Sequence, residues 1–213
     1  MSLVNELGYY HRFLAGEPSG KGVTLLLLHG TGGDESDLIP LGQALAPGAA
    51  LLSPRGRVLE NGMPRFFRRL AEGVFDQKDL KIQTENLAQF IKAAAQAYNL
   101  RADRVVAVGY SNGANIASSV LLTHTGLLAA AVLFRPMVPL VPSKTPDLKA
   151  LKLFIAAGNH DVIATTGEIA RLTELFESGG AAVTTFWHNG GHELAQDDLD
   201  AATHWLSQWV AAL

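Results

Sequence analysis

A serine lies between glycines at residues 109–113, where a strand-like segment gives way to a helix-like one. The sequence there is Gly-Tyr-Ser-Asn-Gly, preceded by the valine-rich run 104–108 and followed by the apolar run 114–122. Such a turn forces the serine, here Ser111, into a strained backbone conformation with its hydroxyl projecting, and small flanking residues let the turn close. The segment predicts a nucleophile elbow, the strand-to-helix turn of an α/β-hydrolase fold.

An aspartate and a histidine follow later strands in the order that this fold requires, which is serine, acid and then histidine. Asp161 follows the apolar run 152–157, and His192 follows the run 182–187 on a glycine-rich turn. An imidazole can take the serine proton and return it to the leaving group, while a carboxylate holds that imidazole in the right tautomer. We therefore expect Ser111, Asp161 and His192 to form a catalytic triad.

Other residues compete for the roles of acid and base. His188 follows the same strand as His192, but the paired glycines just before His192 supply the flexible loop that a catalytic histidine needs. Asp34 and Asp147 are rival acids, but neither ends a strand between the serine and the histidine. Each feature alone is common in turns. Catalysis is favoured because the features occur in the required order and each directly follows an expected strand.

The loop after the leucine-rich run 24–28 can supply hydrogen bonds to a developing negative charge. It reads His-Gly-Thr-Gly-Gly at residues 29–33. An oxyanion hole uses the N–H of the residue after the nucleophile and one N–H from this first loop. By position these residues are Asn112 and Thr31. We expect the ring of His29 to support the loop through hydrogen bonds.

The composition limits the class of protein. A chain of 213 residues fits one α/β domain spanning residues 1–213. The formal net charge of −3 gives no reason to expect nucleic acid or a membrane as a partner. The lack of cysteine excludes disulfides, thiolate metal sites and a cysteine nucleophile. The first twenty residues lack the apolar core of a signal peptide, so a cytoplasmic location is expected.

Strand-like and helix-like segments alternate along the chain, which predicts a mostly parallel central sheet with helices on both faces. The expected strands are 9–14 at an antiparallel edge, then 24–28, 49–52, 104–108, 130–134, 152–157 and 182–187. The expected helices are 37–45, 84–98, 112–123, 166–178 and 195–212. This arrangement leaves no length for a large cap domain over the site.

The arginine-rich segment 55–69 interrupts this alternation after the third expected strand. It carries five arginines against one glutamate. One interpretation is a substrate-binding wall, in which Phe66 and Phe67 contact an acyl or aryl group and an arginine attracts a polar or anionic substrate. The other is a solvated loop whose phenylalanines fill the core. Met137 and Val138, after the fifth expected strand, are further candidates for substrate binding.

Four motifs make the sequence similar to the phospholipase/carboxylesterase group of α/β-hydrolases, which includes bacterial carboxylesterases and acyl-protein thioesterases. They are Leu-His-Gly-Thr-Gly-Gly at 28–33, Gly-Tyr-Ser-Asn-Gly-Ala-Asn at 109–115, Ala-Gly-Asn-His-Asp at 157–161 and Gly-Gly-His-Glu-Leu at 190–194. The segments 54–56 and 60–67 further resemble bacterial carboxylesterases associated with hydroquinone metabolism. The resemblance covers nearly the whole chain and implies the same triad and the same oxyanion hole.

Two positions depart from the thioesterases, which typically carry Trp-Phe-Asp where this chain has Arg-Phe-Phe at 65–67, and glutamine where it has Asn112. The expected function is therefore a serine carboxylesterase that hydrolyses small or short-acyl esters through an acyl-enzyme, with no cofactor and no metal. The alternatives are an acyl-thioesterase or lysophospholipase with the same triad, a non-catalytic binding module, and a lyase or peroxidase on this fold. A homodimer is compatible with the sequence.

Overall fold

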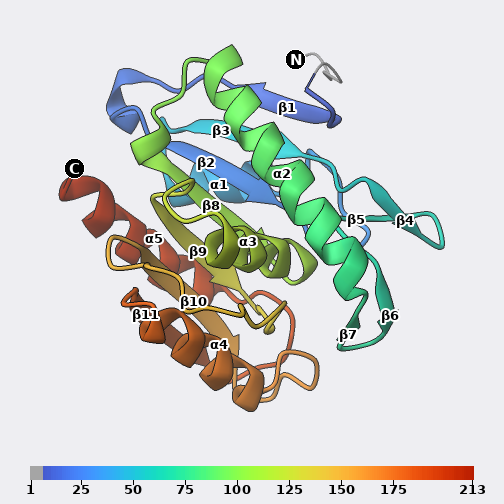
Figure 1. Cartoon of the computed structure of the whole chain (residues 1–213). Coiled ribbons are helices and arrows are strands. Elements are labelled where there is room, and N and C mark those ends of the chain that lie inside the picture. Colours follow the sequence, from blue (N-terminus) through green and yellow to red (C-terminus); the bar gives the residue numbers. More distant parts are fainter. Residues whose placement is uncertain (1–6) are drawn as a thin grey trace.

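Seven strands form one sheet in the computed structural model, which describes residues 7–213 (Figure 1). In order across the sheet they are β1 (His11–Leu14), β3 (Ala50–Pro54), β2 (Thr24–Leu28), β8 (Val105–Tyr110), β9 (Ala130–Phe134), β10 (Lys152–Gly158) and β11 (Ala182–His188). Every neighbouring pair is parallel except β1 with β3. The prediction of a mostly parallel sheet with one antiparallel edge strand is confirmed.

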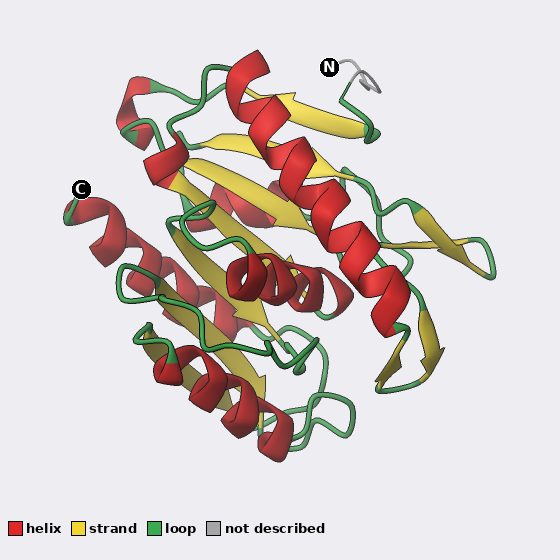
Figure 2. Ribbon diagram, in the orientation of Figure 1, coloured by secondary structure: helices red, strands yellow, loops and turns green. Residues whose placement is uncertain are grey.

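The helices of the described chain cover both faces of this sheet (Figure 2). On one face lie α2 (Gln77–Ala97), α3 (Asn112–Thr123) and α4 (Thr166–Ser178), and on the other lie α1 (Ile39–Leu45) and α5 (Gln196–Ala211). Two short 3-10 helices, η1 (Pro18–Gly20) and η2 (Ala102–Arg104), precede β2 and β8. Over residues 7–213, no helix combines the length and the apolar character needed to cross a bilayer.

The central strand β2 is buried on both of its faces. Leu25 and Leu27 belong to the core shared with α1 and α5, whereas Leu26 and Leu28 belong to the core shared with α2 and α3. Alternate residues of a strand point to opposite faces, so a continuous leucine run suits a strand that is covered on both sides. Burial of each leucine contributes about 1.5–3 kcal/mol, which makes β2 an anchor of both cores.

The helix α2 begins earlier than the sequence predicts. The apolar periodicity indicates a start near residue 84, but the helix begins at Gln77. The carboxylate of Asp76 accepts hydrogen bonds from the backbone N–H groups of Lys78 and Asp79, each at 3.1 Å. This N-terminal cap satisfies backbone donors that would otherwise lack a partner, and so it stabilises about two further turns of helix.

Two small hairpins connect β3 to α2 and occupy the arginine-rich segment and the residues that follow it. They are β4 (Val58–Glu60) with β5 (Met63–Arg65), and β6 (Arg69–Ala71) with β7 (Val74–Phe75). Asn61 and Gly62 have φ angles of 52° and 81°, as a two-residue hairpin turn of this kind requires. Within the described residues no larger cap covers the sheet (Figure 1). The single domain expected for residues 1–213 includes residues 1–6, which lie outside the described part, and stays a prediction.

The first turn of α3 presses against the end of β2. A Cβ atom at Gly113 would lie 1.9 Å from the carbonyl oxygen of Leu28, and one at Gly109 would lie 2.7 Å from the Cα atom of Ala114. Because the opposing atoms belong to the backbone, these positions have room only for glycine. The two glycines near Ser111 therefore set how closely the elbow approaches the loop after β2.

We expect Gly113→Ala to lower the free energy of unfolding by about 3 kcal/mol, because the added methyl group must displace the backbone of α3 or β2. Gly167→Ala is the matched control, since a Cβ atom there meets only Thr165 Oγ1, at 3.9 Å. The control should raise the unfolding free energy by about 0.5 kcal/mol. Urea titration measures both effects. A Gly113→Ala protein as stable as the wild type would contradict this account of the packing.

Candidate active site

Ser111 lies at the elbow between β8 and α3, with φ 51° and ψ −113°. A non-glycine residue with positive φ costs on the order of 1–3 kcal/mol and persists only where its surroundings hold it. The Ser111 N–H donates to the carbonyl oxygen of Phe134 at 2.9 Å, and its carbonyl oxygen accepts from the Asn115 N–H at 2.9 Å. The strained turn that the sequence predicts is therefore present, at the carboxyl ends of the strands.

Ser111, His192 and Asp161 lie in one hydrogen-bonded line. His192 Nε2 is 2.9 Å from Ser111 Oγ, and His192 Nδ1 is 2.8 Å from Asp161 Oδ2. The second carboxylate oxygen accepts from the N–H groups of Ile163 and Ala164, at 2.8 and 2.9 Å. The carboxylate is thus fixed, and it directs the other ring nitrogen of His192 toward the serine. Chemically, this arrangement can move a proton from the hydroxyl to the imidazole.

The competing residues lie elsewhere. His188 Nε2 lies 2.6 Å from Arg135 Nη2, so the ring of His188 faces the buried guanidinium. Asp34 accepts a hydrogen bond from a backbone N–H of its own loop, at 2.7 Å. Asp147 forms an exposed ion pair with Lys149 at 3.7 Å. The structure therefore brings together the favoured residues and keeps these three in other contacts.

Thr31 and Asn112 line the same cavity as Ser111. Asn112 is the first residue of α3, so its N–H is one of the helix-start donors that no carbonyl of the helix satisfies. The loop that contains Thr31 is fixed to the hairpins, because the Gly32 N–H donates to the carbonyl oxygen of Pro64 at 2.9 Å. The N–H groups of Thr31 and Asn112 remain the predicted oxyanion hole.

His29 holds this loop through both ring nitrogens, as the sequence predicts. Its Nδ1 donates to the Gly30 carbonyl oxygen at 2.6 Å, and its Nε2 accepts from the Gly56 N–H at 2.9 Å. The second bond requires a neutral ring. Burial lowers the pKa of His29 below its ordinary value of 6.5, which favours that neutral form. His29 therefore contributes to the site by fixing its neighbours.

A cavity of about 220 Å³ opens beside Ser111 and His192. Its other polar lining residues are Thr31, Arg65, Arg69, Glu72, Tyr110, Asn112 and Asn115, and its apolar lining residues include Phe75, Met137 and Ile163. This volume is small compared with the roughly 300–1,000 Å³ of pockets that hold drug-sized ligands. The cavity has room for a compact substrate with both polar and apolar parts.

Two arginines that line the cavity share Glu60 as an ion-pair partner. Arg69 Nη2 lies 2.8 Å from Glu60 Oε1, and Arg65 Nε lies 3.3 Å from Glu60 Oε2. The hydrogen bond from Arg69 holds the pKa of Glu60 below its ordinary value. Burial lowers the pKa of Arg65, whose Nη1 also donates to Thr31 Oγ1 at 2.6 Å. This side of the cavity carries two positive charges against one paired carboxylate, with Glu72 exposed at the rim.

Phe66 and Phe67 do not line the cavity, so their assignment to substrate binding is corrected. Their side chains are 1% and 0% exposed. The Phe66 ring packs 4.8 Å from His29, and the Phe67 ring packs 5.1 Å from Phe75, centroid to centroid. The hairpin segment folds both rings inward, so the alternative that they fill the core is the one observed. Phe75, which the sequence did not single out, lines the cavity instead.

Met137 lines the cavity but Val138 does not. The Val138 N–H donates to Glu168 Oε2 at 3.1 Å, and its side chain packs against the core. The assignment of Val138 to substrate binding is therefore corrected as well.

Two asparagines on α3 fix the loops that form the cavity wall, and the sequence analysis missed this role. Asn112 Oδ1 accepts from the Phe66 N–H, and Asn115 Oδ1 accepts from the Met137 N–H, each at 2.7 Å. Both side chains are buried. Their spacing of three residues puts them on one face of the helix, and two polar side chains on an otherwise apolar first turn are the pattern that could have revealed them.

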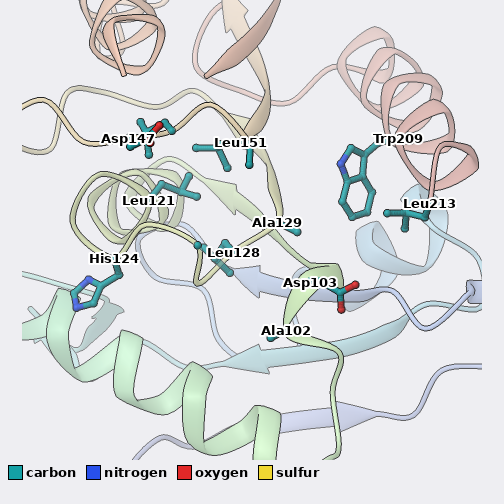
Figure 3. A pocket seen from close by; sticks show the side chains of 13 residues that line it. Ala102, Asp103, Leu121, His124, Leu128, Ala129, Asp147, Leu151, Trp209 and Leu213 are labelled. Carbon is teal, nitrogen blue, oxygen red and sulfur yellow. The ribbon is translucent and has the colours of Figure 1, made fainter. Parts of the chain in front are cut away.

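Another cavity, of about 370 Å³, lies at the opposite edge of the sheet (Figure 3). Its lining residues Ala102, Ala129 and Leu151 come just before β8, β9 and β10, and Trp209 and Leu213 close one side. The predicted catalytic residues instead follow the carboxyl ends of these strands. In open α/β sheets reactions occur at that carboxyl edge, and the smaller cavity beside Ser111 is therefore the candidate site.

The chain is similar to known hydrolases over most of its length. The sequence profile of the dienelactone hydrolase family matches residues 60–207, more than half of the chain. The "putative hydrolase MhqD" of Bacillus subtilis (strain 168) is 48% identical over 186 residues, which cover 87% of this chain and 93% of that protein.

Solved structures of carboxylesterases share this fold. The carboxylesterase of Bacillus cereus is 45% identical, with a TM-score of 0.93, and the match covers 96% of each chain. A carboxylesterase from Mesorhizobium loti is 34% identical, with a TM-score of 0.91, over 97% of this chain and 98% of that one. These likenesses agree with the α/β-hydrolase fold and with a hydrolase of the carboxylesterase type.

We expect the free energy of unfolding to fall as the pH is lowered below about 6.5. The pKa of His29 is lower in the folded protein than in the unfolded chain, so the unfolded chain binds a proton at His29 at a higher pH than the folded protein does. The contribution of neutral His29 to the free energy of unfolding is fully present above pH 6.5. It is lost as the pH approaches the lower pKa of His29 in the folded state. His29→Gln lacks this titration, so its unfolding free energy should fall less steeply, by up to about 1.4 kcal/mol per pH unit. Urea unfolding of both proteins between pH 8 and pH 5 (roughly the range where histidine titrates) measures the difference, and parallel curves would contradict the prediction.

Proposed function

The chain belongs to the dienelactone hydrolase family, and we propose that it is a serine carboxylesterase that hydrolyses small or short-acyl esters through an acyl-enzyme. The observation that carries this proposal is the hydrogen-bonded line of Ser111, His192 and Asp161 at the mouth of a cavity. The likeness to carboxylesterases supports the reaction class. The cytoplasmic location and the homodimer stay predictions.

In the first half of the proposed reaction, Ser111 Oγ attacks the ester carbonyl carbon while its proton passes to His192 Nε2. The carbonyl oxygen becomes an oxyanion, which the N–H groups of Thr31 and Asn112 stabilise. The bond to the alcohol oxygen then breaks, and His192 returns the proton to the departing alcohol. Asp161 stabilises the imidazolium throughout, since its oxygen accepts the His192 Nδ1–H.

In the second half, water replaces the alcohol. His192 takes a proton from the water as its oxygen attacks the acyl carbon, and the oxyanion forms again at the same N–H groups. The bond to Ser111 Oγ breaks, and His192 returns the proton to the serine. One ester and one water thus give one acid and one alcohol. His192 accepts or returns the proton in each step, and water is the second substrate.

The size of the cavity supports short substrates. A volume of about 220 Å³ beside Ser111 accommodates a short acyl chain and a compact alcohol, whereas a long fatty acyl chain would extend beyond it. Arg65 and Arg69 make one wall polar, while Phe75, Met137 and Ile163 supply an apolar surface. A long-chain thioesterase or lysophospholipase would need a longer apolar groove than these residues provide.

We expect the purified protein to hydrolyse p-nitrophenyl acetate and butyrate faster than the octanoate and palmitate, with no metal added. Ser111→Ala should lower kcat by about 10⁵–10⁶-fold, because no other hydroxyl is placed beside His192 Nε2 in the described residues. Steady-state kinetics with the four esters measure both effects. Acyl-thioesters of matched chain length test the thioesterase alternative.

Ser118→Ala is the matched control for this experiment. Ser118 is also a serine of the segment 111–119, but its side chain is buried and donates to the Ala114 carbonyl oxygen at 2.9 Å. The control should keep wild-type kinetics. A folded wild-type protein that cleaves no ester would contradict the proposal, and so would a Ser111→Ala protein that retains activity.

A further inference from the structure

The three consecutive carbonyl oxygens around His192 each accept a hydrogen bond from a side chain. Arg135 Nε donates to the Gly191 oxygen at 3.1 Å, and Arg135 Nη2 donates to the Glu193 oxygen at 2.8 Å. The Tyr110 hydroxyl donates to the His192 oxygen at 3.1 Å. Burial raises the pKa of Tyr110, which keeps this donor protonated. The loop that carries the predicted base is therefore fastened on both sides of that base by one guanidinium.

A buried carboxylate holds the guanidinium in place. Arg135 and Asp198 are both completely buried, and they pair through two contacts, of 2.5 Å from Nη2 and 3.2 Å from Nη1. Asp198 also accepts from the Ala195 N–H at 2.9 Å, in the first turn of α5, where the helix dipole favours a negative charge. A paired and fully hydrogen-bonded geometry is what a charge needs to be stable in the interior. The pair therefore fixes the end of the histidine loop to α5.

His188 completes the surroundings of the guanidinium. Its Nε2 lies 2.6 Å from Arg135 Nη2. His188 is the last residue of β11, so it marks the point where the histidine loop leaves the sheet. The guanidinium thus contacts the start of the loop, both neighbours of His192, and the helix that follows.

The backbone at Arg135 links this group to the serine. Arg135 has a φ of 54°, a conformation that is costly for a non-glycine residue and that marks functional positions. Its N–H donates to the Ala156 oxygen at 2.9 Å, and the carbonyl of the preceding Phe134 accepts from the Ser111 N–H at 2.9 Å. The end of β9 therefore holds the nucleophile elbow with its backbone and the histidine loop with the Arg135 side chain.

We propose that Arg135 is a positioning residue that holds His192 at hydrogen-bonding distance from Ser111, and that Tyr110 assists it. The inference rests on the proposed function, because it assigns His192 the role of base. Arg135 does not line the cavity, so it acts through the loop and not on the substrate; Tyr110 does line it, so the test of positioning rests on Arg135. A misplacement of about 1 Å at a reacting group can reduce the rate about 10²-fold, which sets the size of the expected effect.

The kinetic test compares Arg135→Met, Arg135→Lys and Tyr110→Phe with the wild type on p-nitrophenyl butyrate. We expect kcat to fall about 10²-fold in Arg135→Met, with KM changed less than about twofold. Arg135→Lys keeps the charge beside Asp198, but its single ammonium group lacks the planar fork that spans two carbonyls. The kcat of Arg135→Lys should therefore lie between that of the wild type and that of Arg135→Met. Tyr110→Phe loses one hydrogen bond without burying an unpaired charge, and a smaller fall in kcat is expected.

A matched control separates positioning from loss of stability. Leu206→Ala removes a buried side chain from α5, the helix that carries Asp198, and touches none of the three loop carbonyls. It should lower the melting temperature while leaving kcat at the wild-type value when assayed below that temperature. A kcat of folded Arg135→Met equal to that of the wild type would overturn the inference, whatever the kcat of Tyr110→Phe.

A proton NMR measurement tests the same claim without turnover. The His192 Nδ1–H proton shared with Asp161 should give a sharp, strongly downfield resonance in the wild type, which Asp161→Asn removes. We expect this resonance to broaden or disappear in Arg135→Met and to remain in Leu206→Ala. An unchanged resonance in Arg135→Met would contradict the inference. If the wild type cleaves no ester but the resonance behaves as expected, the proposed function fails while the positioning of His192 by Arg135 stands.

Discussion

The close approach of Gly113 to the backbone of Leu28 is the contact on which the geometry of the site depends. It seats the start of α3 against the end of β2, so the turn that carries Ser111 lies beside the loop that contains Thr31. The same approach brings the Asn112 side chain within 2.7 Å of the Phe66 N–H. This one backbone contact thus sets the relative positions of the nucleophile, both predicted oxyanion donors and the wall of the cavity.

Buried polar side chains hold the loops that this arrangement leaves without regular structure. The ring of His29 fastens the first loop, and Arg135 fastens the histidine loop. A buried polar group costs free energy unless its partners are present, and here the partners are backbone groups of the loops themselves. Strained residues are therefore tolerated: Ser111 and Arg135 both have positive φ and both are tied to neighbouring strands.

The sequence predicts the frame of the site well because that frame depends on local patterns. Most strands of the parallel sheet are short apolar runs, and Asp161 and His192 lie in the loops that follow β10 and β11. The burial of Phe66 and Phe67 depends instead on how the hairpin segment packs against His29 and Phe75, which no local pattern specifies. Asn61-Gly62 is a strong hairpin pattern that could have revealed the first of these hairpins. The role of Arg135 was hidden because its partner, Asp198, lies 63 residues further along the chain.

The most direct test of the account is to trap the acyl-enzyme. The wild type is mixed with p-nitrophenyl acetate, quenched in acid during turnover, digested, and the peptides are examined by mass spectrometry. The account predicts an acetyl group on Ser111, absent from the Ser111→Ala protein. Hydrolysis of the ester with no adduct on Ser111, or with the acetyl group on another residue, would contradict it.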